Sequence, residues 1–149
     1  MALPRPPRTI LAVEDDPVMR RAIERALCGP NGALQAMAAA RAVGDVQVRF
    51  AATGNEALRA LADHAPAFVL LDYVLPDMEA PQVLAAVRAA EHTRTTPVVV
   101  FSSVADPSRM RGVLAGGANS WVPKTDDPEA FEAAVRAIAN YWLHVHSAP

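Results

Sequence analysis

The sequence predicts an α/β protein built as a doubly wound, five-stranded parallel sheet in one domain. Five short apolar segments alternate with longer segments of helical spacing, which is the pattern of repeated strand–helix units. The most apolar segments, residues 67–71 and 97–101, show no polar alternation, as expected of strands buried on both faces. With 149 residues, of which 52% are hydrophobic and 20% charged, the chain suits a single domain with a substantial core.

The first strand is expected at residues 9–13, and it runs directly into Glu14, Asp15 and Asp16. Three adjacent acids repel one another, and placing them behind an apolar strand is costly. A hard divalent cation such as Mg²⁺, which takes one or two carboxylates plus waters, would offset the repulsion. The alternative is a solvated N-cap for a helix at residues 17–27. That alternative accounts for Asp16 but leaves Glu14 and Asp15 unexplained.

The segment between the first helix and the second strand is longer than a short connection requires. Residues 28–32 indicate a helix end and a turn, and the alanine-rich residues 33–43 favour a helix. The second strand is expected at residues 46–51. We therefore predict an insertion at about residues 29–45, as an extra helix or as a lengthened first helix broken at Gly29-Pro30. Whether the insertion is a harmless surface feature or a contact for a partner stays open.

Asp72 stands where residues 67–71, the third predicted strand, give way to a carboxylate, and Pro76 follows four positions later. Pro76 cannot continue a strand ladder, so the chain turns away. Ligands of open parallel sheets collect beyond the carboxyl ends of the strands. Taken alone, Asp72 is equally an ordinary loop residue, since Asp is a common turn former. Helices are expected before and after this strand, at residues 53–63 and 82–91.

The last two predicted strands also end in polar side chains. Residues 97–101 run into Ser102, and residues 119–122 precede Lys124. Because the carboxyl ends of parallel strands meet at one edge of a sheet, two acidic strand ends, one hydroxyl and one ammonium could converge there. Two further helices are expected after these strands, at residues 107–115 and 128–143.

These residues, in this order, resemble the receiver domain of two-component response regulators. The match consists of the acidic pair after the first strand, Asp72 with Pro76, the hydroxyl of Ser102 five positions after Pro97, and Lys124 preceded by an aromatic residue. It covers nearly the whole chain. The resemblance implies the flavodoxin-like receiver fold with strand order 2-1-3-4-5, in which the first and third strands flank the topological switch point.

The resemblance also implies a magnesium site. Asp15 and Asp72 would bind Mg²⁺ directly, and Glu14 would act through a water molecule. The backbone carbonyl of Val74 would complete the protein's share of the ligands. Asp72 would be the phosphoacceptor, whose carboxylate takes a phosphoryl group from a histidine kinase to give an aspartyl phosphate. The cation would neutralise the charge that opposes attack by one anion on another.

Three further residues would respond to the phosphoryl group. The resemblance implies that Lys124 pairs with one phosphoryl oxygen and that Ser102 donates a hydrogen bond to another. Movement of Ser102 toward the new charge would pull the loop that follows it. Trp121 occupies the second switch position, where Tyr or Phe is common in the family; packing in the core or at an interface is the alternative role. The expected output is a phosphorylation-dependent change of a partner-binding surface.

The chain departs from the family pattern at a few positions. Val74 and Val104 stand where the family controls access of water to the phosphoryl group, so we expect slow autohydrolysis. Ala80 replaces a common glycine. These departures keep open a phosphorylation-independent pseudo-receiver that acts only as a protein-interaction module. A phosphohydrolase of the haloacid dehalogenase type needs a second acid where Val74 stands, so we do not expect an enzyme.

The two ends of the chain are expected to lie outside the domain. We predict a Pro-rich tail at residues 1–8, the receiver domain at residues 9–143 and a C-terminal tail at residues 144–149. The pair Tyr141-Trp142 resembles the C-terminal ends of phytochrome-associated single-domain response regulators. This resemblance suggests a stand-alone regulator, a bacterial phytochrome as its kinase, and a homodimer formed through the C-terminal helix, since Tyr and Trp are enriched at interfaces.

Composition limits the other partners. The formal net charge is −2, and Lys and Arg are scattered, so we expect no nucleic-acid surface. No apolar run approaches the roughly 20 residues that a membrane span needs. The single cysteine, Cys28, excludes an internal disulfide and fits a reducing compartment, so a cytoplasmic location is expected.

Overall fold

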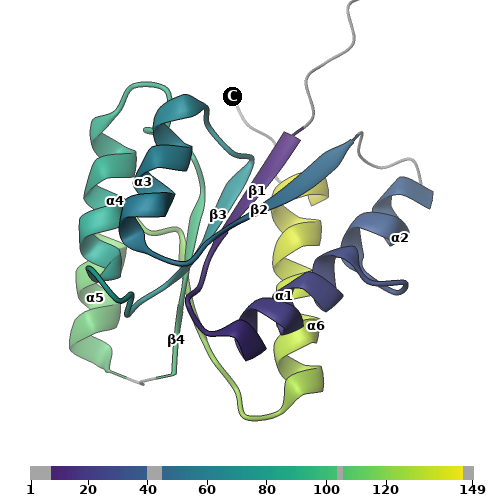
Figure 1. Ribbon diagram of the computed structural model, residues 1–149. Coiled ribbons are helices and arrows are strands. Elements are labelled where there is room, and N and C mark those ends of the chain that lie inside the picture. The colour runs from purple at the N-terminus through teal and green to yellow at the C-terminus, as the bar shows by residue number, and fades with distance from the viewer. Residues whose placement is uncertain (1–7, 40–44, 104–105, 146–149) are drawn as a thin grey trace, which may run out of the picture.

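The computed structural model describes residues 8–39, 45–103 and 106–145, which form a five-stranded parallel sheet in the order β2-β1-β3-β4-β5 (Figure 1). The predicted fold class and strand order are therefore confirmed. After β2 at one edge, the chain crosses back over β1 and forms β3 on its other side. The topological switch point therefore lies between the carboxyl ends of β1 and β3. The strands are β1 (Arg8–Val13), β2 (Val46–Ala51), β3 (Phe68–Asp72), β4 (Val98–Ser102) and β5 (Ser120–Pro123).

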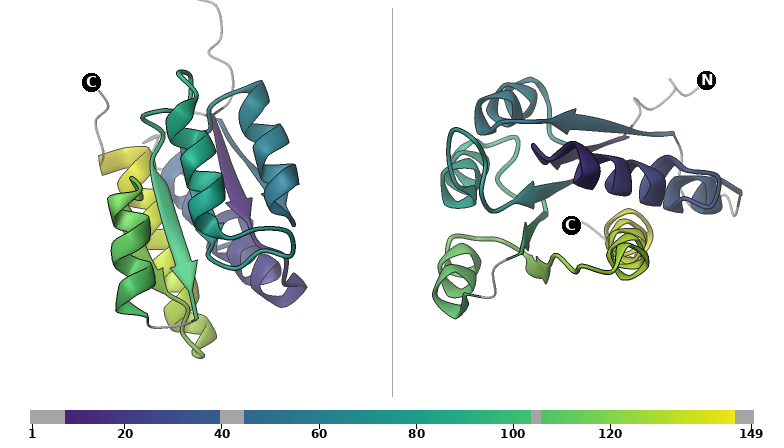
Figure 2. Two further views of the ribbon diagram at one scale, coloured as in Figure 1. Left: turned by 90° about the vertical axis from the view of Figure 1, so that its left-hand side faces the viewer. Right: turned by 60° about the horizontal axis from the view of Figure 1, so that its bottom comes forward.

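Helices cover both faces of the sheet (Figure 2). One face carries α3 (Gly54–Asp63), α4 (Ala80–Ala89) and α5 (Pro107–Ala115). The other carries α1 (Pro17–Cys28), α2 (Ala33–Ala39) and α6 (Pro128–Asn140), which continues into a short π-helix, η1 (Tyr141–Val145). Each face has its own apolar core, so the central strands are buried from both sides.

The third strand shows how the two cores divide. Its residues alternate: Val69 and Leu71 pack in the core under α3, α4 and α5, while Phe68 and Leu70 pack in the core under α1 and α6. All five residues of β3 are buried, as are all five of β4. A strand covered on both faces thus requires an uninterrupted apolar run. In β3 and β4 this run ends with a polar residue, Asp72 and Ser102, at the carboxyl edge of the sheet.

The predicted insertion contains an extra helix, α2, which was one of the two alternatives that we expected. The preceding helix α1 ends with Gly29 as its C-cap. Ala33 and Met37 are buried in the core that α1 and α6 share, so this helix enlarges that core. The described part of this helix runs to Ala39; the predicted continuation to residue 43 lies outside the described residues.

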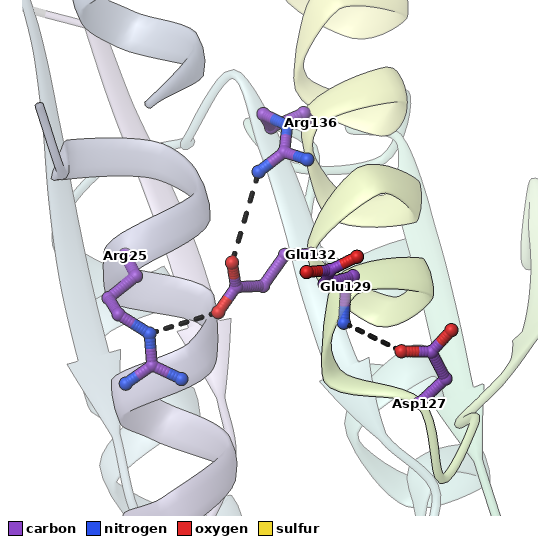
Figure 3. Close-up of polar contacts among 5 residues, drawn as sticks. All are labelled: Arg25, Asp127, Glu129, Glu132 and Arg136. Carbon is purple, nitrogen blue, oxygen red and sulfur yellow. Dashed lines mark hydrogen bonds and ion pairs between the residues drawn. The ribbon is translucent and has the colours of Figure 1, made fainter. Parts of the chain in front are cut away.

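Helices α1 and α6 also meet through charged side chains (Figure 3). Arg25 Nε of α1 lies 2.9 Å from Glu132 Oε1 of α6, and within α6 Arg136 Nη1 lies 3.9 Å from Glu132 Oε2. The Arg25 side chain is 58% exposed, so solvent screens this contact and its contribution to stability is small. The apolar residues beneath it, among them Val135 with no exposed area, therefore hold the two helices together.

The ends of the fold differ from the predicted boundaries by a few residues. Arg8, which we expected in the N-terminal tail, begins β1: its amide donates to Asp45 O at 3.0 Å. The Arg8 Nη1 group also donates to the carbonyl oxygen of Leu143 at 3.2 Å. The C-terminal helical segment continues to Val145, so residue 144 is not the start of a tail. Residues 1–7 and 146–149 lie outside the described part of the chain.

Candidate functional site

Three carboxylates gather at the carboxyl edge of the sheet. Glu14 and Asp15 follow β1 directly, and Asp72 is the last residue of the neighbouring strand β3. One oxygen from each side chain lies within 4.8 Å of the other two. Glu14 is 1% exposed and Asp72 is 7% exposed, whereas Asp15 is exposed to solvent. The sheet topology thus brings together residues that are almost sixty positions apart in the sequence.

Lys124 supplies the positive charge at this edge. It follows β5, and its amide donates to Ser102 O at 2.8 Å, which continues the pairing of β4 with β5. Its Nζ lies 2.8 Å from Glu14 Oε2 and 3.1 Å from Asp72 Oδ1. One ammonium group therefore bridges two buried carboxylates that come from different strands.

Ser102 is the last residue of β4, the strand between Asp72 and Lys124. It is 4% exposed and pairs with Pro123 in the register of β4 and β5. Its strand thus lies between β3, which ends in Asp72, and β5, which Lys124 follows. Val104, two positions later, lies outside the described residues.

Burial and charge alter the proton affinity of this cluster. Burial, reinforced by repulsion from Asp72, raises the pKa of Glu14 from 4.5 to about 7, although hydrogen bonding and attraction from Lys124 act in the opposite direction. Burial lowers the pKa of Lys124, but its contacts with Glu14 and Asp72 outweigh that effect and leave the pKa raised. Lys124 is therefore charged near neutral pH, while Glu14 titrates there.

We expect the metal-free protein to lose stability as the pH rises from about 4.5 to about 7. The folded state binds the Glu14 proton more tightly than the unfolded state does, so the free energy of unfolding falls across this window. A shift of this size corresponds to about 3 kcal/mol. Urea denaturation in EDTA at pH 5 and pH 7.5 should show a smaller fall for Glu14→Gln than for the wild type. Equal falls in both proteins would contradict this assignment.

The aromatic residue Trp121 contacts the residue that follows Asp72. Trp121 is half-buried in β5, and its ring centroid lies 5.6 Å from that of Tyr73. On α5, Arg109 Cζ lies 4.9 Å from the centroid of the Tyr73 ring. The sequence reasoning did not single out Tyr73, which links the edge of the site to β5 and α5.

The donor set suits a hard divalent cation. All three clustered side chains offer carboxylate oxygens, and no softer nitrogen or sulfur ligand belongs to the group. Two of them are buried beside a single ammonium, so a cation with open positions for water would relieve their repulsion. Val74, whose carbonyl the family resemblance adds to the ligands, lies two residues after Asp72 in the loop that leaves β3.

The sequence of residues 10–136 matches the family model of the response regulator receiver domain. The chain belongs to this family. Among curated relatives, it is 35% identical over 128 residues to the transcriptional regulatory protein KdpE of Mycobacterium tuberculosis, an alignment that covers 86% of this chain and 49% of KdpE. The receiver chain thus spans about half the length of this relative.

Solved structures show the same receiver fold. The phosphorylated cyanobacterial phytochrome response regulator RcpA superposes with a TM-score of 0.81 at 22% identity, over 97% of this chain and 99% of RcpA. The Mn²⁺-bound response regulator Rcp1 gives a TM-score of 0.79 at 21% identity, over 96% of this chain and 99% of Rcp1. Receiver structures thus hold divalent cations, and the acidic cluster of this receiver fits one. Within the described residues, every helix is too short or too polar to cross a membrane.

Proposed function

We propose that this receiver is a phosphorylation-dependent switch in which Asp72 accepts a phosphoryl group from a histidine kinase. The observation that carries the proposal is the buried ion triad: the Lys124 ammonium lies 2.8 Å from Glu14 Oε2 and 3.1 Å from Asp72 Oδ1. Burying two carboxylates and one ammonium at a strand edge costs stability, and proteins commonly keep such charge clusters at sites where they serve a function. Acceptance of an anionic group beside a divalent cation is such a function.

In the proposed reaction, one carboxylate oxygen of Asp72 forms a bond to phosphorus. The bond between phosphorus and the donor's imidazole nitrogen breaks, and that nitrogen keeps the electron pair. Mg²⁺ held by Glu14, Asp15 and Asp72, with the Val74 carbonyl, would supply neutralisation of the phosphoryl charge. Lys124 would exchange its contact with Asp72 for one with a phosphoryl oxygen, because a second anion then competes for the ammonium.

The response to this new charge would spread through two neighbours of the site. Ser102 would donate its hydroxyl to a phosphoryl oxygen and move the chain that follows β4. Trp121 and Arg109 both contact the Tyr73 ring next to Asp72, so a shift at Asp72 would reach β5 and α5. We propose that this side of the molecule carries the phosphorylation-dependent partner surface.

The direct test is incubation with acetyl phosphate, a small phosphoryl donor, with Mg²⁺ or with EDTA. Intact-protein mass spectrometry should show the mass of one added phosphoryl group only when Mg²⁺ is present. Beryllofluoride, a phosphoryl mimic, should protect the protein from thermal unfolding under the same conditions. No uptake and no protection would favour the pseudo-receiver, a module that binds its partner without phosphorylation.

The lifetime of the phosphorylated form is proposed to be long. The Val74 side chain is 53% exposed and presents an apolar surface two residues after Asp72, where a polar side chain could hold an attacking water. Val74→Asn should therefore raise the rate of phosphate loss several-fold, measured as the decay of the phosphorylated mass after removal of acetyl phosphate. A wild-type lifetime equal to that of the variant would contradict the proposed role of Val74.

We further propose that this receiver is cytoplasmic, that a sensor histidine kinase such as a bacterial phytochrome is its donor, and that it forms a homodimer through α6 and η1. Similarity to RcpA supports the choice of kinase. Tyr141, 47% exposed, packs edge-on against Trp142 with ring centroids 4.8 Å apart, beside a groove of about 450 Å³ that Ile138 also lines. Sedimentation analysis with and without beryllofluoride tests the dimer, which a monomer at high protein concentration would rule out. Phosphotransfer from a panel of purified kinases tests the donor.

A further inference from the structure

Asp77, in the loop between β3 and α4, binds the first turn of α3. Its Oδ1 accepts a hydrogen bond from Gly54 N at 2.8 Å, and its Oδ2 accepts one from Asn55 N at 2.9 Å. The amides at a helix start have no partner within the helix, and a carboxylate there also meets the positive end of the helix dipole. The amides of Asn55 and Gly54 hold the pKa of Asp77 below its usual value, so the carboxylate is charged at neutral pH.

The next residue makes a second contact with the same position. Met78 lies so close to Gly54 that a Cβ atom at residue 54 would collide with the Met78 side chain. Met78 also packs against the core under α3 and α4. Two consecutive residues of the loop therefore dock on Gly54, one through its carboxylate and one through its apolar side chain.

This loop is the part of the chain that directly follows the proposed phosphoacceptor Asp72. Tyr73 N donates to Phe101 O at 2.9 Å, Ala80 N donates to Tyr73 O at 2.8 Å, and Leu75 N donates to Met78 O at 3.0 Å. The loop is thus a narrow hairpin that continues β3. Its base is fixed to the sheet by Tyr73, and its tip is fixed to α3 by Asp77.

Helix α3 has its own cap, which separates the two roles that Asp77 could have. Thr53 is the N-cap residue, and its Oγ1 accepts a hydrogen bond from Glu56 N at 3.0 Å. The Glu56 carboxylate in turn accepts from Ala52 N at 2.7 Å. The helix start is therefore stabilised by its own residues, whereas the Asp77 contacts join it to a loop more than twenty positions away in the sequence.

We infer that Asp77 is a positioning residue for the divalent cation: by tying the loop to α3, it fixes the carbonyl of Val74 where a cation bound to Asp72 can use it. This inference rests on the proposed magnesium site. Residues that hold metal ligands in place, without touching the metal, commonly change metal affinity when they are replaced.

The test compares Asp77→Ala with Thr53→Ala, which removes a hydrogen bond from the same helix turn but none from the loop. Mg²⁺ affinity is measured by tryptophan fluorescence, to which Trp121 beside Tyr73 contributes. Asp77→Ala should weaken Mg²⁺ binding about tenfold. Asp77→Asn, which keeps one carbonyl acceptor, should fall between this variant and the wild type. Thr53→Ala should lower the melting temperature while its Mg²⁺ affinity stays close to that of the wild type.

A second readout needs no metal. Hydrogen exchange of the Leu75 and Ala80 amides should be faster in Asp77→Ala than in the wild type, and unchanged in Thr53→Ala. Wild-type affinity and wild-type exchange in folded Asp77→Ala would overturn the inference, as would equal losses of affinity in both variants. A wild type that binds no Mg²⁺ would overturn the proposed function and the metal part of this inference, while the exchange rates would still decide whether Asp77 anchors the loop.

Discussion

An Asp72→Asn variant is expected to take up no phosphoryl group from acetyl phosphate or from a phosphorylated kinase. The amide keeps the shape of the carboxylate but removes the negative oxygen that would attack phosphorus. The fold should persist, because Lys124 retains its contact with Glu14. Intact mass after incubation with acetyl phosphate and Mg²⁺ measures the loss, and circular dichroism confirms that the variant is folded.

A matched control is Asp16→Asn. Asp16 lies one residue past the acidic cluster and caps α1, where its Oδ1 accepts a hydrogen bond from Val18 N at 2.9 Å. Asn is an equally good N-cap, so this variant should keep its stability and its phosphoryl uptake. Uptake by Asp72→Asn at the wild-type level would show that the acceptor is another residue and would end the proposal for Asp72.

The second large effect is expected for Lys124→Met. Removing the ammonium takes away a donor to the phosphoryl oxygens, and loss of one such group typically slows a reaction about a hundredfold. It also leaves Glu14 and Asp72 buried together without a cation, which should cost about 3–5 kcal/mol of stability in EDTA at pH 8. The cost should be smaller at pH 5.5, because Glu14 then binds a proton and one charge disappears.

The double variant Glu14→Gln/Lys124→Met separates charge from packing. It lacks one of the two buried carboxylates as well as the ammonium, so it should be more stable at pH 8 than Lys124→Met alone. Urea denaturation of the wild type, the two single variants and the double variant gives the coupling free energy. A Lys124→Met protein with wild-type stability and wild-type rate of phosphorylation would contradict the role of the ion triad.

The strands were predictable because burial on both faces leaves a simple pattern. The observed β3 and β4 each begin and end one residue later than the uninterrupted apolar runs, and the same cause applies to both strands. Asp72 pairs with Phe101, and Ser102 pairs with Pro123, so both polar residues belong to the sheet ladder instead of to loops. In the sequence, a polar residue after an apolar run looks like the start of a loop, so the true end of each strand was missed. The sheet ladder nevertheless holds Asp72 and Ser102 in place.

The start of helix α4 could have been predicted from a local capping signal in the sequence. It begins at Ala80, two residues earlier than predicted, because Glu79 and Gln82 form a capping box in which Glu79 N donates to Gln82 Oε1 at 3.1 Å. Ala80, which replaces a common glycine of the family, is fully buried in the core at the first position of this helix. The substitution is therefore accommodated by packing.

The contacts that the sequence could not reveal are those between distant segments. Asp77 reads as an ordinary turn residue after Pro76, and only the folded chain shows that its carboxylate binds α3. Tyr73 reads as one more residue after a strand, and only the fold places it between Trp121 and Arg109. The residues of the acidic edge were predictable because each stands at the end of an apolar run, whereas these partners depend on packing that no local spacing encodes.

The hydrogen bond from Arg8 to the carbonyl of Leu143 brings the two ends of the described fold to the edge of the sheet where β1 begins. The acidic cluster lies at the other end of the same strand. We therefore expect attachment of a fluorescent reporter beyond the Arg8 end to leave phosphoryl uptake from acetyl phosphate at the wild-type level.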